Sequence, residues 1–283
     1  MTTTLEKLNA VCEARPFTVR YFIKNLRSGE VFNRGGDEET PSASTRKISI
    51  MMAALKAVHE GRLDLAEPIV YEERLREEVA SGVFRYLTPG ITLSLRDAIV
   101  AMIVLSDNVC TRMVLERLTL EEVDRYCRSI GMVGTHHRFL IPPLALASDH
   151  ALEEVTTTTA NDQGLLMEAI LAAQASEAAA ARLGSSVELC AFALQTLKQQ
   201  LLRYGIHSRL PFETEIASKS GRGKRGRMDV GAVFHNASPL YIIAAFTDQV
   251  PMVLSDGTPG YVVSQDVIGA LSRVCWEQFC PSP

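Results

Sequence analysis

Residues 44–55 read STRKISIMMAAL, which is the pattern Ser-x-x-Lys followed by an apolar run. Pro41 and Ser42 precede it, and residues of these types are typical of a loop that leads into a helix. A helix over residues 44–60 places Ser44 and Lys47 on one face, where the hydroxyl and the amine can meet. A serine needs a base to become a nucleophile, and a lysine with a lowered pKa can be that base. Taken alone, the pattern is better explained as a polar helix start, because Ser-x-x-Lys often occurs by chance.

Length and composition indicate a globular protein with a sizeable core. The chain has 283 residues, of which 47% are hydrophobic and 22% are charged. Its net charge of −4 gives no reason to expect nucleic acid or an anionic membrane as a partner. The N-terminus lacks a basic segment followed by an apolar one, and no apolar run approaches the ~20 residues of a membrane helix. We therefore expect a cytoplasmic protein without a signal peptide.

The six cysteines are scattered, without a Cys-x-x-Cys pair or a histidine spacing typical of zinc. In a reducing compartment such cysteines are expected to be free thiols. The sequence therefore predicts neither a metal site nor a cofactor.

Strand and helix patterns divide the chain. Strand patterns lie at both ends, at residues 17–23, 31–32, 213–219, 229–234 and 240–246. Helical patterns lie at residues 5–13, 44–60, 95–105, 109–117, 120–130, 160–173, 187–202 and 264–279. This order predicts an α+β fold, in which an antiparallel sheet from both termini is flanked by helices and an all-α lobe is inserted. We expect a single domain over residues 1–283, with an α/β lobe at about 1–40 and 206–283 and an all-α lobe at about 41–205.

A second polar cluster, Ser106-Asp107-Asn108, comes directly after an apolar helix pattern. Such residues usually cap a helix or turn the chain. As a functional cluster, Ser106 would relay a proton, and Asn108 would hold the substrate or Lys47.

A third cluster, Lys219-Ser220-Gly221, ends a predicted strand. A charged residue at a strand end is unremarkable by itself. As a functional cluster, Lys219 would be an electrostatic anchor and Ser220 would offer a hydroxyl to the substrate. Gly221 would allow close approach of the backbone.

In this order the three clusters resemble the signature of class A β-lactamases and penicillin-binding proteins, which is Ser-x-x-Lys, Ser-Asp-Asn and Lys-Thr/Ser-Gly. Their spacings of about sixty and about one hundred and ten residues are similar to the class A arrangement. Residues 81–93, 157–160 and 229–231 also resemble segments of this family, so the likeness covers nearly the whole chain. It implies the class A β-lactamase-like fold.

The resemblance also implies a mechanism. Ser44 would attack a carbonyl carbon and become acylated, Lys47 would take its proton, and Ser106 would protonate the leaving atom. The backbone amide of Ser44 and a second amide near Gly223 would form the oxyanion hole. The substrate would be a small molecule with a carbonyl centre and a carboxylate. The residues expected to bind it are Asn108, Lys219, Ser220, Gly221 and Arg222.

The sequence departs from the family pattern in the expected omega loop. The family carries Glu-x-x-Leu-Asn upstream of the threonine run, and its glutamate positions the water that hydrolyses the acyl-enzyme. Residues 141–155 contain no such motif, and Glu153 and Glu154 lie too close to the threonines to be equivalent. His150 is a candidate base in this loop, although a surface role explains it better. We therefore expect doubtful deacylation and weak hydrolysis of β-lactams.

The second departure is Arg222, which stands where the family has a small hydroxyl residue. Its guanidinium could clamp a substrate carboxylate. It could equally belong to a solvated, flexible hairpin tip, which is the better explanation for Lys224 and Arg225.

The sequence therefore predicts a serine hydrolase that forms an acyl-enzyme on Ser44 and hydrolyses a lactam, an amide or an ester. Two alternatives stay open. A cytoplasmic esterase or peptidase acting on a small metabolite fits a protein that is not exported. A non-hydrolysing β-lactam-binding sensor fits the missing glutamate. The sequence does not indicate the oligomeric state.

Overall fold

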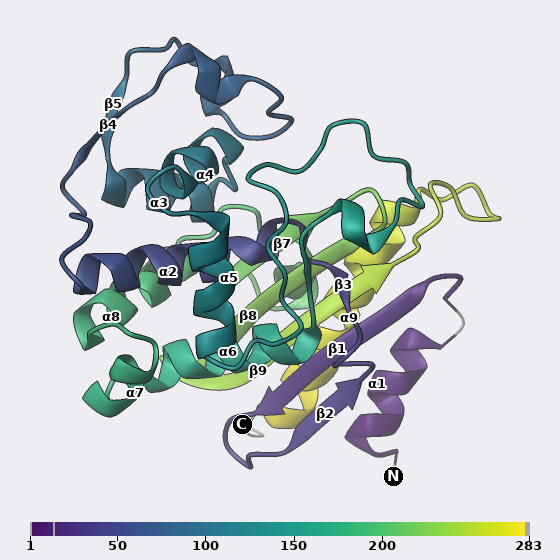
Figure 1. Ribbon diagram of the computed structural model, residues 1–283. Coiled ribbons are helices and arrows are strands. Elements are labelled where there is room, and N and C mark those ends of the chain that lie inside the picture. The colour runs from purple at the N-terminus through teal and green to yellow at the C-terminus, as the bar shows by residue number, and fades with distance from the viewer. Residues whose placement is uncertain (1, 14, 281–283) are drawn as a thin grey trace.

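The computed structural model describes residues 2–13 and 15–280. Its main sheet has five antiparallel strands in the order β2-β1-β9-β8-β7 (Figure 1). The strands are β1 (Thr18–Asn25), β2 (Val31–Arg34), β7 (Ile216–Arg222), β8 (Arg227–His235) and β9 (Ser238–Asp248). Because β1 pairs with β9, strands from both ends of the chain build one sheet, which confirms the expected architecture.

Helices from both ends of the chain cover one face of this sheet. α1 (Thr4–Cys12) packs against α9 (Gly260–Phe279), and α9 packs against β8 and β9. Side chains alternate between the two faces along each strand, so each face needs its own apolar cover. Fully buried residues fill the space on this face, among them Tyr21, Ile23, Ile243 and Leu271.

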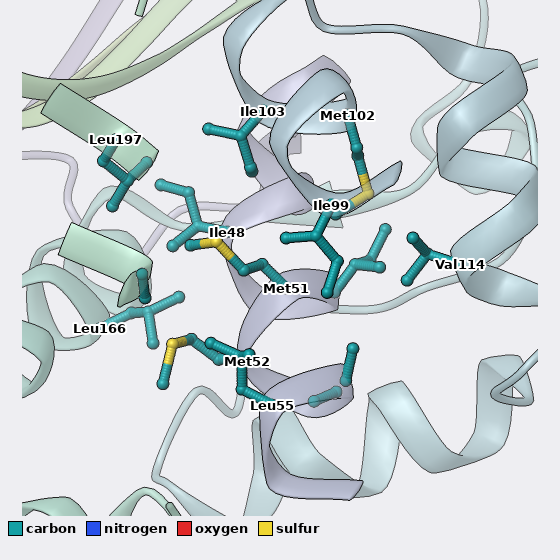
Figure 2. Packing of buried hydrophobic residues seen from close by; sticks show 14 of the residues in the cluster. Ile48, Met51, Met52, Leu55, Ile99, Met102, Ile103, Val114, Leu166 and Leu197 are labelled. Atoms are coloured by element: carbon teal, nitrogen blue, oxygen red, sulfur yellow. The ribbon is translucent and has the colours of Figure 1, made fainter. Parts of the chain in front are cut away.

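α2 (Lys47–His59) is the centre of the helical lobe, which packs against the other face of the sheet. Its residues 47–55 are all buried, because an apolar run without a polar face needs neighbours on every side. Figure 2 shows Ile48, Met51, Met52 and Leu55 among side chains of the surrounding elements. The other helices of the lobe are α3 (Leu95–Val104), α4 (Asn108–Leu115), α5 (Leu120–Ser129), α6 (Ala160–Ala172), α7 (Glu177–Arg182) and α8 (Val187–Lys198).

Two short strand pairs fix the connections of this lobe. β3 (Thr40–Pro41) pairs with β6 (Thr157–Thr158), and β4 (Pro68–Val70) pairs with β5 (Thr92–Ser94). β3 lies just before the segment that holds Ser44, and β6 lies just after residues 139–156. The first pair therefore keeps the loop 139–156 beside the start of α2.

Two elements near the candidate residues differ from the sequence prediction. Ser44 lies in a 3-10 turn, Ala43–Arg46, and α2 begins only at Lys47. The tight turn forms because the Thr45 amide donates to the Ser42 carbonyl (3.1 Å). β7 runs three residues further than expected, because its pairing with β8 continues to Arg222. The third cluster therefore lies inside a strand and not at its end.

Among the described residues, no helix has the length and apolarity needed to cross a membrane. The six cysteines are free thiols, and all but Cys280 are buried in the two cores. In residues 2–13 and 15–280, no three histidine, cysteine, aspartate or glutamate side chains gather so that they could hold a metal ion. The buried thiols therefore contribute to packing.

The contact of α6 with β1 gives a test of the fold. Gly164→Ala should lower the free energy of unfolding by about 1–3 kcal/mol, because a Cβ at this position in α6 overlaps the ring of Phe22 on β1. Without that overlap, alanine would stabilise the helix by about 1 kcal/mol. The sign of the change in the free energy of unfolding therefore shows whether the overlap exists. Urea denaturation measures the change. As the control, the same substitution in a Phe22→Ala background should not be destabilising, and a stabilised single variant would contradict this packing.

Candidate active site

Ser44 is partly exposed in the short turn between β3 and α2. The preceding residue, Ala43, has a φ of 42°, which is strained for a residue other than glycine. A Cβ on Gly221 would lie only 3.1 Å from the Ala43 Cβ, so the turn sits directly against β7. Strain held in place by surrounding structure is common at functional sites, and it marks this turn as the centre of the candidate site.

Lys47 is fully buried in the first turn of α2. Its amine donates to the Ser106 carbonyl (2.8 Å), to Ser106 Oγ (3.2 Å) and to Asn108 Oδ1 (2.7 Å). An ammonium group would donate all three bonds, whereas a neutral amine would donate to the two carbonyl oxygens and accept from the Ser106 hydroxyl. Among the described residues, no hydrogen bond links this amine to Ser44 Oγ. The first two clusters therefore meet through Lys47. Of the two roles expected for Asn108, holding the substrate or holding Lys47, the structure shows the contact with Lys47.

The surroundings of Lys47 favour the neutral amine. Burial, the positive charge of Lys219 and that of Arg46 lower the pKa of Lys47 well below its ordinary value of 10.5. A neutral amine can take a proton from a hydroxyl, whereas an ammonium group cannot. The lowered pKa of Lys47 thus suits a general base, although its amine is held by Ser106 and Asn108 and not by Ser44.

The segment Ser106-Asp107-Asn108 joins α3 to α4. Ser106 has a φ of 55°, a second strained backbone at the site. Asp107 caps α4, since its Oδ1 accepts from the amides of Val109 (2.8 Å) and Cys110 (3.1 Å). Its Oδ2 accepts from the amide of Phe84 (2.9 Å). The interpretation of the triplet as a helix cap is therefore right for Asp107, which also ties the start of α4 to the turn at Phe84.

Lys219 is fully buried in β7, and its amine donates to the Ser220 carbonyl (2.8 Å). Its charge lies close enough to lower the pKa of Lys47, so the third cluster reaches the same region. Burial lowers the pKa of Lys219 to about 7, against the attraction of Asp229 on β8. Burial also raises the pKa of Asp229 to about 7, although its Oδ2 accepts from the Ile206 amide (3.0 Å).

The positions of Ser220 and Gly221 give less support to their predicted roles as substrate contacts. Ser220 is buried opposite Asp229 in the register of β7 and β8. Its Oγ is enclosed and has no hydrogen-bond partner in the part of the chain that the structure describes. Gly221 does permit a close approach, but the groups that approach it are the side chains of Met228 and Ala43.

The amide of Gly223 is already engaged, because it donates to the Gly226 carbonyl (3.0 Å) in the turn between β7 and β8. Hydrogen-bonded pairs alternate along antiparallel strands, so the next pair, Arg222 and Arg227, is not hydrogen-bonded. The Arg222 amide therefore points away from β8, toward the free edge of the sheet at β7. Of the amides near Gly223, that of Arg222 can act as an oxyanion donor. The Ser44 amide lies in a first helical turn, where amides have no partner inside the helix.

A pocket lies beside Ser44 under the loop 139–156. Its apolar walls include Pro41, Phe139, Pro142, Leu146 and Val155. Its basic groups are Arg46, His150, Arg222 and Lys224. Among the described residues that line it there is no carboxylate, which agrees with the absence of the family glutamate from the sequence of this loop.

The prediction of a solvated hairpin tip is wrong for Arg225. Its side chain is buried, binds both oxygens of Asp248 (2.7 and 2.8 Å) and donates to the His150 carbonyl (2.5 Å). A buried ion pair needs such matched, bidentate geometry to offset the loss of hydration. Arg225 thereby ties the turn between β7 and β8 to the loop 139–156. Lys224 is exposed, as expected.

Sequence reasoning found the three clusters but not the residues that support them. Arg46 lies inside the Ser-x-x-Lys motif and Asp107 inside Ser-Asp-Asn, and this position was the feature of the sequence that could have pointed to them. Arg225 and Asp229 carried no signal of their own, since each acquires its partner only through the fold.

The class A β-lactamase-like fold expected from the motifs is confirmed by solved structures. The β-lactamase from Sphaerobacter thermophilus DSM 20745 matches 99% of this chain and 98% of its own, with a TM-score of 0.81 and 26% sequence identity. PBP-A matches 99% of this chain and 96% of its own, with a TM-score of 0.82 and 23% identity.

The model of the beta-lactamase enzyme family matches residues 4–279, so the chain belongs to this family. Beta-lactamase SME-1 of Serratia marcescens is 32% identical over 112 residues. That alignment spans 39% of this chain and 37% of the Serratia protein.

The buried carboxyl of Asp229 makes a prediction about pH and stability. In the unfolded chain this group ionises near its ordinary pKa of 3.8, whereas in the folded chain it keeps its proton up to about pH 7. At this carboxyl the folded state therefore binds more protons than the unfolded chain between these values, and the contribution of Asp229 to stability falls as the pH rises. The loss relative to Asp229→Asn should be up to about 1.4 kcal/mol per pH unit.

Urea denaturation of wild type and Asp229→Asn from pH 4.5 to pH 7.5 measures this difference. Asp266→Asn on α9 is the control, because that carboxylate is partly exposed and ion-paired with Arg209. It should follow wild type. Parallel pH profiles for wild type and Asp229→Asn would show that the buried carboxyl is ionised throughout.

Proposed function

We propose that this protein is a serine hydrolase in which a lactam, an amide or an ester acylates Ser44. The observation that supports this most is the buried amine of Lys47, held by Ser106 and Asn108 and three residues along the chain from Ser44. A serine beside an amine with a lowered pKa has what nucleophilic catalysis requires. Membership of the beta-lactamase enzyme family supports the same reaction class.

In the acylation step, Ser44 Oγ attacks the carbonyl carbon while the Lys47 amine takes the hydroxyl proton. The amine must turn from Ser106 or Asn108 toward Ser44, and such contacts often tighten only when substrate is bound. The amides of Ser44 and Arg222 stabilise the oxyanion. As the bond between the carbonyl carbon and the leaving nitrogen or oxygen breaks, Ser106 Oγ gives its proton to the leaving atom. Ser106 Oγ takes in exchange the proton that Lys47 removed from Ser44, so both side chains return to their starting protonation states.

Hydrolysis of the acyl-enzyme needs a base that activates water. The described lining of the pocket offers no carboxylate, and Nδ1 of His150 lies 2.8 Å from the Ala151 carbonyl, to which it is hydrogen-bonded. We therefore propose that deacylation is slow and that β-lactams are weak substrates. A long-lived adduct would fit a sensor, whereas rapid turnover of a simple ester without a lactam adduct would fit an esterase.

Intact mass spectrometry after mixing with benzylpenicillin tests the proposal. Wild type should gain the mass of one penicillin, and Ser44→Ala should gain none, because the nucleophile is gone. Lys47→Met should slow the gain by about 100-fold or more, since the general base is lost. Ser28→Ala, in an exposed turn, is the matched control and should behave as wild type. Labelling of Ser44→Ala at the wild-type rate would place the nucleophile elsewhere.

A further inference from the structure

Arg46 is a buried cation without a carboxylate partner. Only 2% of its surface is exposed. Its Nη1 donates to the Phe139 carbonyl and to Thr156 Oγ1 (3.1 Å), and its Nη2 donates to the Leu140 carbonyl (2.5 Å). In residues 2–13 and 15–280, no aspartate or glutamate forms an ion pair with it. Buried charges are normally paired, so the charge of Arg46 calls for a partner that the chain itself does not provide.

The unused donors of Arg46 suit a carboxylate. Of five N–H groups, three have the acceptors just named, which leaves Nε–H and one N–H of Nη2. Arg225 holds both oxygens of Asp248 with the same two nitrogens, Nε and Nη2. Nε of Arg46 is not fully enclosed, and Arg46 belongs to the lining of the pocket beside Ser44. Burial lowers the pKa of Arg46 to about 10, and the group stays charged at pH 7.

The pocket that Arg46 lines is basic at its polar end and apolar elsewhere. Arg222, Lys224 and His150 share it, while Phe139 and Leu146 belong to its apolar wall. Arg222 and Lys224 are exposed, so their charges add to the potential without being buried themselves. The pocket thus combines a buried cation, exposed cations and an apolar wall.

The position of the pocket indicates which part of a substrate would enter it. Its wall includes Ala43, which directly precedes the candidate nucleophile Ser44. It also includes Arg222, whose amide is the candidate second oxyanion donor. Ser44 itself does not line the pocket, and neither do Ser106, Asn108 and Lys219. The leaving atom must face Ser106, so the acyl part of the substrate is directed to this pocket.

We propose that this pocket is a subsite for a carboxylate on the acyl side chain of the substrate, with Arg46 as its anchor. The subsite rests on the proposed function, since it names the substrate class of the same site. It predicts a substrate that carries a negative charge on the acyl side, next to an apolar group that fits the wall of Phe139 and Leu146. Arg222 and Lys224 draw that charge to the pocket, and Arg46 fixes it by two N–H bonds.

Benzylpenicillin and its α-carboxylated form, carbenicillin, are a matched pair of probes. Calorimetric titration of the Ser44→Ala variant measures binding without acylation. Carbenicillin should bind about tenfold more tightly than benzylpenicillin, as expected for one charge-assisted bidentate contact. Adding Arg46→Gln should bring the ratio of the two affinities, carbenicillin to benzylpenicillin, close to one. Arg182→Gln removes an exposed charge on α7 and should leave the ratio unchanged.

Arg46 also holds the loop 139–156, so its substitution can disturb the fold of the pocket as well as remove the charge. A second variant therefore removes charge from the pocket while leaving Arg46 in place. In the Ser44→Ala background, Arg222→Gln/Lys224→Gln should lower the ratio by about threefold, because these exposed groups act through the local potential. A ratio near one in Ser44→Ala itself, or a ratio unchanged in both charge variants, would overturn the subsite. If wild type is not acylated but the preference for carbenicillin persists in Ser44→Ala, the nucleophile assignment fails and the subsite stands.

Discussion

Three hydrogen bonds hold the amine of Lys47, and the rest of the candidate site depends on them. They join the start of α2 to the segment between α3 and α4, although Lys47 and Ser106 lie 59 residues apart in the chain. The contacts place the amine, and its burial beside two other cations disfavours its charge. One arrangement therefore sets both the position and the protonation state that a base needs.

Positive charge is the second constraint. The basic side chains of Lys47, Lys219 and Arg46 are all buried, and each of them that is charged destabilises the folded state unless neighbours compensate. Asp229 is one such neighbour, but burial leaves its carboxyl largely protonated below about pH 7. Backbone carbonyls supply other acceptors, including two at the start of the loop 139–156 for Arg46. Buried cations with so little compensation are expected where an anionic ligand or a developing negative charge is bound.

Much of the fold followed from patterns in the sequence, because periodicity and short motifs report local structure. Strand patterns at both ends correctly predicted a sheet built from both termini, and the family resemblance predicted how it is arranged. Element ends were less predictable. The 3-10 turn at Ser44 depends on a strained Ala43 held by β7, and the length of β7 depends on pairing with β8. The burial of Arg225 could not be predicted, because its partners Asp248 and His150 meet it only in the folded chain.

The pKa of Lys47 tests the central claim most directly. Labelling lysine side chains with ¹³C at Cε and following the Lys47 signal by NMR over pH 5 to pH 11 would measure it, with Lys47→Met used to assign the signal. We expect a midpoint well below 10.5. A midpoint near 10.5 would mean that Lys47 is an ammonium group at neutral pH, and a lysine base for Ser44 would then be excluded.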